Sequence, residues 1–186
     1  MILYIYIKLN KNTKAIYGNP APGVIRNIGV QISTGEYICF LDDDDCFMPN
    51  KIEVQLREMI SENAVFSSTD AYIGWGEYDK NKKYKTYNEE HFKNDRMGRL
   101  RNMKIYLDEY PKWIDLFLTQ RENLIIHSTV MMHRSIFDKF KYNNKKPGDE
   151  DYQLWLTLLN EYKCLYINLP LIYYDDNHAG DHDGNH

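Results

Sequence analysis

The chain has 186 residues, of which 43% are hydrophobic and 27% charged, and its formal net charge is −4 at pH 7. This composition is typical of a globular protein and excludes a fibrous repeat or a disordered chain. The length suits one compact domain over residues 1–186, with a disordered tail over 175–186. Lys and Arg are interspersed with the acids and form no basic stripe, so binding to nucleic acid is not expected.

The cysteines and the opening residues bear on the compartment. Cys39, Cys46 and Cys164 are odd in number and lack metal-ligand spacing, which favours reduced thiols. Residues 1–9 are apolar but too short to cross a bilayer, and they lack the features of a secretion signal. We therefore predict no transmembrane segment and a cytoplasmic protein, with peripheral membrane association as the alternative.

The first half of the chain alternates strand and helix patterns. Residues 1–9 alternate as in a strand, and residues 10–22 are rich in turn formers. Residues 24–34 have helical spacing, with Gly35 placed as a C-cap. The apolar run over 36–41 is typical of a central strand covered on both faces.

A helix is predicted to begin near Pro49. The residues expected on its buried face are Ile52, Leu56, Met59 and Ile60. The residues expected to face solvent are Lys51, Glu53 and Arg57.

The second half predicts two further strands, over 64–73 and 164–174, and a strand-like segment over 124–132. Residues 149–161 form an amphipathic helix pattern that places Trp155 in the core. The polar segment 74–101 is weakly periodic and is predicted to be a loop, in which we would look for acceptor specificity. The alternation of elements indicates an α/β fold.

Four consecutive aspartates, Asp42 to Asp45, follow the predicted central strand. Their mutual repulsion calls for a cation, and oxygen ligands without Cys or His favour Mn²⁺ or Mg²⁺ over Ca²⁺. The carboxyl ends of strands are where open α/β sheets bind ligands. The alternative interpretation is a solvated acidic turn that caps the next helix.

Three segments carry a resemblance to a known family: VIRNIG at 24–29, STGEYICFLDDDD at 33–45 and PNKIE at 49–53. Together they closely resemble the family 2 glycosyltransferases with the GT-A fold. The resemblance implies a GT-A-like nucleotide-diphospho-sugar transferase with a mixed central sheet flanked by helices. Asp42 and Asp44 match the family's Asp-x-Asp motif for metal and nucleotide sugar, so the implied donor-binding residues are Arg26, Asp42, Asp43 and Asp44.

Two later segments extend the resemblance, HSTVMMHR at 127–134 and EDYQLWL at 150–156. They are similar to the family's acceptor-side strand and its Glu-Asp helix, which implies that Asp151 is the catalytic base. A carboxylate at a helix start could take the proton from an attacking hydroxyl. The implied acceptor-side residues are His127, Ser128 and Glu150, although a structural role is the common alternative for a lone histidine.

The segment over 173–178 resembles a donor-side part of the family and implies His178 as a metal ligand beside Asp44 and Asp42. The alternative is a polar, histidine-rich tail that includes His182 and His186. Residues 1–9 are similar to the family's third strand, so the chain is interpreted as lacking the family's first two strands.

The implied activity is metal-dependent, inverting transfer of a sugar from a nucleotide-diphosphate donor to an acceptor hydroxyl. A UDP-sugar is the expected donor, and a glycan, lipid or protein is the expected acceptor. The first alternative is a non-catalytic or partner-dependent remnant that binds metal or glycan, working as a homo-oligomer or with a partner chain. The second is a structural domain stabilised by Ca²⁺ through the aspartates.

Overall fold

The computed structural model describes residues 5–143 and 148–177, and within them one seven-stranded mixed sheet has the order β1-β6-β3-β7-β2, with β4 on β3 and β5 on β7. β3 and β7 pair in parallel, whereas the other pairs are antiparallel. The strands are Tyr37–Cys39 (β1), Cys46–Phe47 (β2), Phe66–Gly74 (β3), Lys85–Thr86 (β4), Trp113–Ile114 (β5), Met131–His133 (β6) and Cys164–Asp175 (β7).

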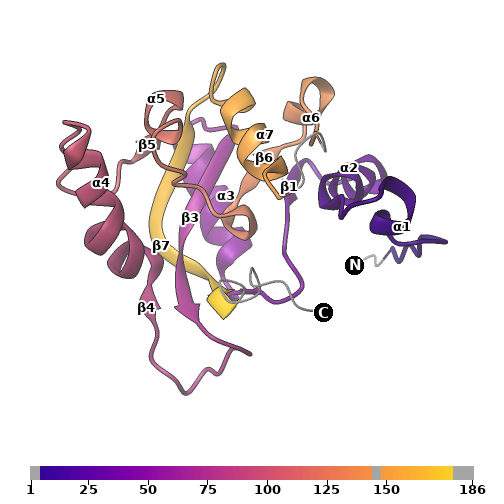
Figure 1. Ribbon diagram of the computed structural model, residues 1–186, viewed down its shortest axis with the longest axis horizontal. Coiled ribbons are helices and arrows are strands. Elements are labelled where there is room, and N and C mark those ends of the chain that lie inside the picture. The colour runs from indigo at the N-terminus through magenta and orange to yellow at the C-terminus, as the bar shows by residue number, and fades with distance from the viewer. Residues whose placement is uncertain (1–4, 144–147, 178–186) are drawn as a thin grey trace.

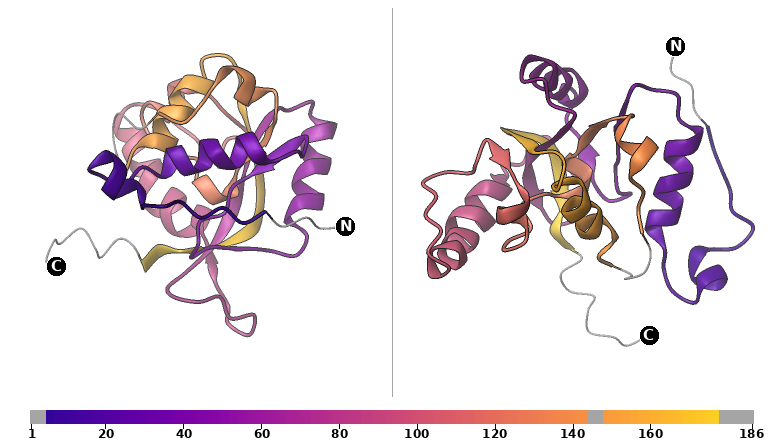
Figure 2. Two further views of the ribbon diagram at one scale, coloured as in Figure 1. Left: turned by 90° about the vertical axis from the view of Figure 1, so that its right-hand side faces the viewer. Right: turned by 90° about the horizontal axis from the view of Figure 1, so that it is seen from above.

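Helices cover both faces of this sheet, since α3 and α7 lie on opposite sides of it (Figures 1 and 2). The predicted α/β class, a mixed central sheet flanked by helices, is therefore confirmed. No helix among the described residues has both the length and the apolar character needed to cross a bilayer. The helices are Thr13–Tyr17 (α1), Pro22–Ile32 (α2), Lys51–Ser61 (α3), Asn88–Arg96 (η1, a π-helix), Met97–Asn102 (α4), Leu116–Thr119 (α5), His127–Thr129 (η2, a 3₁₀ turn), Ile136–Lys139 (α6) and Glu150–Leu158 (α7).

The hydrophobic core lies between the long central strands and α7. Trp155 of α7 is fully buried and stacks on Phe66 of β3, with the ring centroids 5.4 Å apart. This confirms the predicted core position of Trp155 and the strands predicted over 64–73 and 164–174. Large apolar burial of this kind fixes α7, and with it the residues in its first turn, against the sheet.

The beginning of the chain differs from the prediction. Residues 5–9 form no strand, and Ile5 and Tyr6 are 53% and 87% exposed. An alternating pattern needs a neighbouring strand to supply hydrogen bonds, and none of the described strands pairs with this segment. The expected loop that follows contains α1, whose N-cap Asn12 accepts a hydrogen bond from the backbone of Ala15.

The predicted central strand is an edge strand. Within the described residues β1 pairs with β6 alone, through Tyr37, Ile38 and Cys39. An apolar run reports burial but not a strand's position in the sheet, and here α2 lies alongside the open edge (Figure 1). The expected placement of the aspartates just after this strand is confirmed.

The helix predicted near Pro49 is confirmed as α3, and Met59 is buried as predicted, but the rest of the predicted buried face differs. Lys51 and Gln55 are fully buried, while Ile52 and Ile60 are 47% and 64% exposed. The side chain of Gln55 donates to the hydroxyl of Ser67 at 3.0 Å and to a backbone carbonyl of η2 at 2.9 Å. The sheet therefore presents polar groups at this point, and a buried polar side chain satisfies them better than an apolar one.

The end of α2 and the start of β6 also differ from the prediction. The predicted helix over 24–34 is confirmed as α2, but it ends at Ser33 in an extended conformation, so the expected Gly35 cap is wrong. The strand-like segment over 124–132 is mostly irregular, and its strand, β6, begins at Met131.

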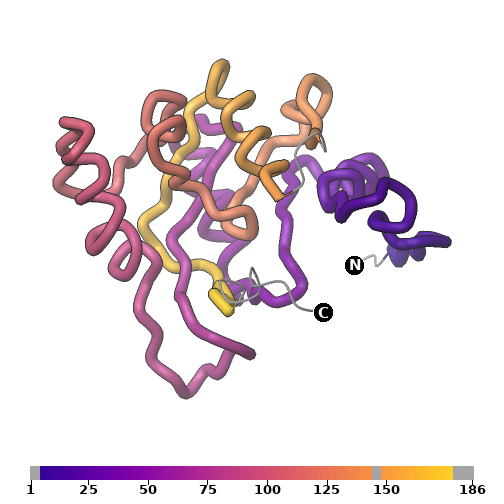
Figure 3. The backbone as a smooth tube through the Cα atoms, in the orientation of Figure 1, coloured from indigo at the N-terminus to yellow at the C-terminus, as the bar shows by residue number. Residues whose placement is uncertain are grey.

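The expected loop over 74–101 is wrong as well, because it contains β4, η1 and α4. Phe92 and Leu100 of this segment are buried in the core. A π-helix has a longer period than 3.6 residues, which explains why its apolar spacing was not visible as helical. Figure 3 shows how this segment runs along the side of the sheet remote from α2.

Candidate active site

The four aspartates form a turn that leads from β1 to β2, and residues 42–45 are called the acidic turn below. The backbone N–H of Asp45 donates to the carbonyl of Asp42 at 3.2 Å, which closes the turn. Asp42 N–H donates to the hydroxyl of Ser128 at 3.1 Å, and the backbone N–H of Asp175 donates to Asp45 Oδ1 at 3.0 Å. Segments from η2 and β7 thus hold both ends of the turn.

Arg26 joins the acidic turn to the start of α7. Its guanidinium donates to Asp42 Oδ1 at 2.9 Å and to Glu150 Oε1 at 3.0 Å. The Arg26 and Glu150 side chains are 16% and 7% exposed, and Asp42 is 40% exposed. Burial opposes ionisation of Arg26, but the neighbouring carboxylates outweigh it and raise the pKa of Arg26. The site therefore holds a permanent cation between two carboxylates from distant segments.

His127 lies beside this ion-pair network as a neutral imidazole. Its Nε2 is 2.9 Å from Tyr142 Oη, and its Nδ1 is 3.7 Å from Asp42 Oδ1, too far for a hydrogen bond. Burial and the charge of Arg26 lower the pKa of His127, and the attraction of Asp42 does not compensate. Its contact with Asp42 is accordingly not an ion pair. Nδ1 is buried without a hydrogen-bond partner among the described residues, which leaves a polar atom beside the acidic turn.

Asp45, the last residue of the acidic turn, has a perturbed carboxylate. Burial raises the pKa of Asp45 to about 6, although hydrogen bonds from Ser128 and from the backbone of Asp175 oppose the rise. Asp45 and Asp175 were missing from the candidate site residues. The run of four acids was the available signal for Asp45, whereas Asp175 reaches the site through the pairing of β7 with β2.

Asp151 occupies the first turn of α7, next to the residue that binds Arg26. Its Oδ1 accepts the backbone N–H of Tyr152 at 2.6 Å. Burial raises the pKa of Asp151, while this backbone bond and the charge of Arg26 oppose the rise. A carboxylate with a raised pKa is a better proton acceptor than an ordinary surface aspartate.

The donor atoms suit a hard divalent ion in type. Asp42 and Asp44 offer carboxylate oxygens, and Mg²⁺ is commonly held by one or two carboxylates with water and substrate phosphates. No group of three or more acidic, His or Cys side chains in residues 5–143 and 148–177 is arranged to hold an ion by itself. His178 lies outside the described residues. The carboxylates therefore fit an ion shared with a diphosphate, not a self-contained metal centre.

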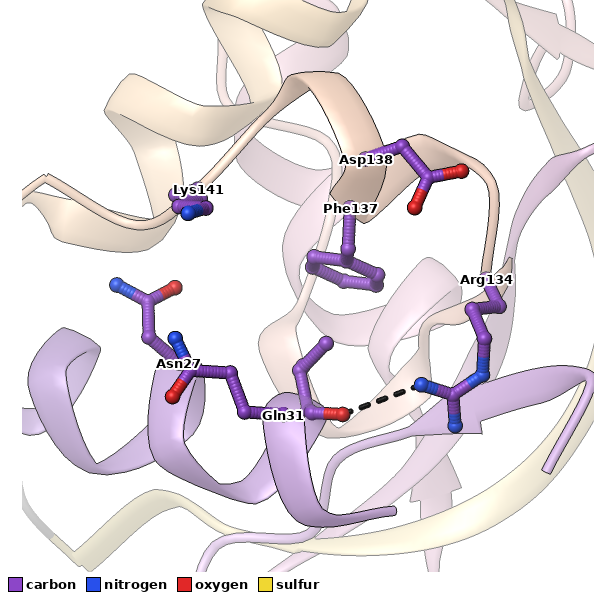
Figure 4. A pocket seen from close by; sticks show the side chains of 7 residues that line it. Asn27, Gln31, Arg134, Phe137, Asp138 and Lys141 are labelled. Atoms are coloured by element: carbon purple, nitrogen blue, oxygen red, sulfur yellow. Dashed lines mark hydrogen bonds between the residues drawn. The ribbon is translucent and has the colours of Figure 1, made fainter. Parts of the chain in front are cut away.

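α2 is held in place on the side away from the acidic turn. Arg134 donates to the carbonyls of Val30 and Gly35 and to the hydroxyl of Ser33, at 3.2, 2.6 and 2.9 Å, so it fastens the end of the helix. Figure 4 shows Arg134 and its bond to the carbonyl of Val30 at a pocket of about 330 Å³ between α2 and α6, which Asn27 and Lys141 also line. None of the predicted site residues lines this pocket.

The structure brings five predicted residues together: Arg26, Asp42, His127, Ser128 and Glu150. Asp151 adjoins this group on α7. Asp43 is exposed and Asp44 half-buried in the acidic turn.

Comparisons with known proteins agree on one family. Residues 18–140 match the model of glycosyl transferase family 2. An uncharacterized glycosyltransferase of Methanocaldococcus jannaschii is 28% identical over 157 residues, which is 84% of this chain and 47% of that protein. The UDP-Glc:alpha-D-GlcNAc-diphosphoundecaprenol beta-1,3-glucosyltransferase WfgD of Escherichia coli is 26% identical over 158 residues, 84% of this chain and 51% of that protein. The chain thus spans about half the length of these two relatives.

Another relative matches a shorter part of the chain at higher identity. An uncharacterized glycosyltransferase of Rickettsia bellii is 49% identical over 51 residues, 27% of this chain and 7% of that protein. Among solved structures, S. aureus TarS 1-349 has a TM-score of 0.54 at 12% identity, over 83% of this chain and 40% of that one. At this identity the likeness concerns the fold alone.

Proposed function

The chain belongs to glycosyl transferase family 2, and from this premise we propose that it transfers a sugar from a nucleotide-diphosphate donor to an acceptor hydroxyl. The family and the GT-A-like fold class predicted from the sequence are both confirmed. One observation carries the proposal: Arg26 hydrogen-bonds to Asp42 and Glu150 at once. This contact joins the acidic turn to the helix start that bears Asp151.

The donor is proposed to bind at the acidic turn. Asp42 and Asp44 would hold Mn²⁺ or Mg²⁺, which when bound neutralises the diphosphate leaving group. Arg26 supplies a fixed positive charge beside the same carboxylates and orients Asp42. Asp43 extends the acidic turn toward solvent. A UDP-sugar is the proposed donor, a choice supported by the name of the Escherichia coli relative, which specifies UDP-Glc.

The acceptor is proposed to be activated by Asp151. Its carboxylate takes the proton of the attacking hydroxyl while that oxygen bonds to the anomeric carbon of the sugar. The bond from this carbon to the diphosphate oxygen breaks in the same displacement, and the electron pair leaves with the nucleoside diphosphate. Attack from the opposite face inverts the anomeric centre and requires no covalent enzyme intermediate.

The remaining residues of the site position these groups. Glu150 fixes Arg26, and Ser128 fixes the start and end of the acidic turn. His127 is buried beside Asp42, with its Nδ1 3.7 Å from Asp42 Oδ1, and forms part of the wall of the site. These roles explain why buried polar side chains gather at this point of the fold.

Calorimetric titration with UDP, with and without Mn²⁺, tests the donor site. We expect metal-dependent binding that is lost in Asp44→Asn and kept in Asp43→Asn, the exposed neighbour. Binding of UDP that is independent of Mn²⁺ and unchanged in Asp44→Asn would contradict the proposed metal role. Absence of UDP binding in the wild-type chain would contradict the donor site, and binding of Ca²⁺ alone would favour a structural metal.

A further inference from the structure

The loop that follows β3 carries an exposed aromatic side chain that the proposed chemistry does not use. Trp75 comes directly after Gly74, the last residue of β3, and is 78% exposed. The other two tryptophans, Trp113 and Trp155, are half-buried and fully buried. A ring of this size contributes to a fold through the apolar area that it buries, and Trp75 leaves most of that area in water.

The backbone on both sides of Trp75 is fixed. The N–H of Gly76 donates to Asp175 Oδ1 at 3.0 Å, and Tyr173 Oη donates to the carbonyl of Gly76 at 2.6 Å. On the other side, a Cβ at Gly74 would lie 2.5 Å from Tyr173 Oη, so a larger residue does not fit there. The exposure of Trp75 is therefore imposed by a fixed backbone and is not the result of a loose loop.

The same hydrogen bonds connect Trp75 to the acidic turn. The carboxylate of Asp175 binds Gly76, and its backbone N–H binds Asp45 Oδ1 at 3.0 Å. In Figure 1 the loop after β3 lies near the end of β7, on the side of the sheet where the chain from β1 arrives. Asp175 thus connects the backbone beside the exposed ring to the acidic turn.

The surroundings of Trp75 suit a sugar ring. A pyranose has one face of C–H groups, which stacks on the electron-rich face of an aromatic ring, and a rim of hydroxyls. Tyr78, three residues after Trp75 in the sequence, is 38% exposed and packs on Tyr173 with the ring centroids 5.4 Å apart. Glu77 is an exposed carboxylate between them in sequence that can accept hydrogen bonds from hydroxyls.

The two substrates need different anchors. The donor is proposed to be held at the acidic turn, which leaves the sugar of an acceptor without an assigned contact, and sugar rings are held by stacking and hydrogen bonds. We propose that Trp75 is a stacking platform for a sugar ring of the acceptor, which makes the acceptor a saccharide. This inference rests on the proposed transferase function and specifies the chemical class of its second substrate.

A membrane surface is the other partner that an exposed tryptophan could meet. Interfacial segments use several apolar residues on one face together with basic ones. The two charged residues nearest to Trp75 in the sequence, Glu77 and Asp79, are acidic and oppose an anionic lipid surface, and four lysines follow them at positions 80, 82, 83 and 85. The charges directly beside Trp75 therefore favour a saccharide, and the comparison with lipid vesicles below tests the membrane alternative.

The test measures saccharide binding directly and needs no turnover. Saturation-transfer NMR is recorded with methyl glycosides of glucose, galactose and N-acetylglucosamine, and with cellobiose, lactose and chitobiose. The proteins compared are the wild-type chain, Trp75→Ala, Trp75→Phe and Tyr106→Ala. Tyr106 is the matched control because its ring is 74% exposed in a different part of the chain, between α4 and β5. Acrylamide quenching of tryptophan fluorescence locates the contact.

We expect at least one saccharide to bind the wild-type chain and to protect its exposed tryptophan from quenching. Binding should weaken roughly tenfold in Trp75→Ala, remain measurable in Trp75→Phe and be unchanged in Tyr106→Ala. Equal binding by Trp75→Ala, or no saccharide binding by the wild-type chain, would overturn the proposal. Protection by vesicles of phosphatidylcholine and phosphatidylglycerol but not by saccharides would overturn it in favour of a membrane contact.

UDP titration of the same proteins tests the donor site separately from the saccharide surface at Trp75. Trp75→Ala should bind UDP as the wild type does, because Trp75 contacts the acceptor and not the diphosphate. If the wild-type chain failed to bind UDP but bound saccharides through Trp75, the donor assignment would fail while the saccharide platform would stand. If the wild-type chain bound UDP but no saccharide, the saccharide platform would fail while the donor assignment would stand.

Discussion

Replacement of Lys51 by methionine probes an unusual feature next to the site, a fully buried lysine. Lys51 Nζ donates to Gln55 Oε1 at 2.6 Å and lies 4.5 Å from the centroid of the Phe47 ring. No carboxylate of the described residues forms an ion pair with it. Lys51→Met keeps the length and the apolar stem of the side chain and removes the charge.

The structure sets the size of the effect. Burial lowers the pKa of Lys51 from 10.5 to about 8, and the thiol of Cys39 opposes the shift only weakly. At about 1.36 kcal/mol per pH unit this amounts to about 3 kcal/mol in favour of the neutral amine. At neutral pH, Lys51→Met relieves this cost but leaves Gln55 Oε1 unpaired, which costs about 1–3 kcal/mol, so the net change there is small.

The pH dependence gives the sharper test. Between about pH 8 and pH 10.5 the unfolded chain binds the Lys51 proton and the folded chain releases it, so folding is stabilised as pH rises through this window. Below pH 8 both states are protonated and the cost is fully present. The free energy of unfolding of the wild type should therefore rise by about 2 kcal/mol relative to Lys51→Met between pH 7 and pH 9.5.

Urea unfolding followed by far-UV circular dichroism at pH 7, 8, 9 and 9.5 measures this difference. Lys163→Met, at an exposed position, is the control and should run parallel to the wild type. Because the charge of the Cys39 thiol also influences the pKa of Lys51, the comparison is repeated in a Cys39→Ser background. A constant difference between the wild type and Lys51→Met over this pH range would refute the assignment of a buried, protonated lysine.

Three further predictions concern the site and the core. Asp45→Asn should remove a loss of stability that the wild type shows as pH rises from about 4 to 6, because burial raises the pKa of Asp45 to about 6; urea unfolding at pH 4.5 and 7 measures it. Trp155→Ala should lower the free energy of unfolding by about 3–5 kcal/mol, and a change below 1 kcal/mol would contradict the packing against Phe66. Asp151→Asn should abolish sugar transfer in a donor-turnover assay and leave UDP affinity unchanged; equal turnover would exclude Asp151 as the base.

Local features were predictable from the sequence because their physical causes are local. Hydrophobic periodicity located α2, α3, α7 and the long strands β3 and β7, and a short apolar run located β1. The position of the aspartates after β1 also follows from the order of residues alone. Motif spacing pointed to the family, which the match over residues 18–140 confirmed.

Features that depend on contacts between distant elements were not predictable. The open edge at β1 and the polar face of α3 follow from which strands and carbonyls lie opposite, and a single sequence does not specify those neighbours. The π-helix escaped detection because its period differs from that of an α-helix. Lys51 was expected to face water, and Gln55 was not expected in the core, because both side chains are polar.

The sequence by itself determined the residue types of the candidate site and their order along the chain: a helix with Arg26, a strand that ends in aspartates, and a helix that begins with Glu150 and Asp151. Only the tertiary structure decided that Arg26 bridges Asp42 and Glu150, which lies 124 residues from it. It also decided that Asp175 links the acidic turn to the loop bearing Trp75. The physical reason is that hydrogen bonds and ion pairs depend on distance in space, which the packing of α2, α7 and β7 against the sheet sets.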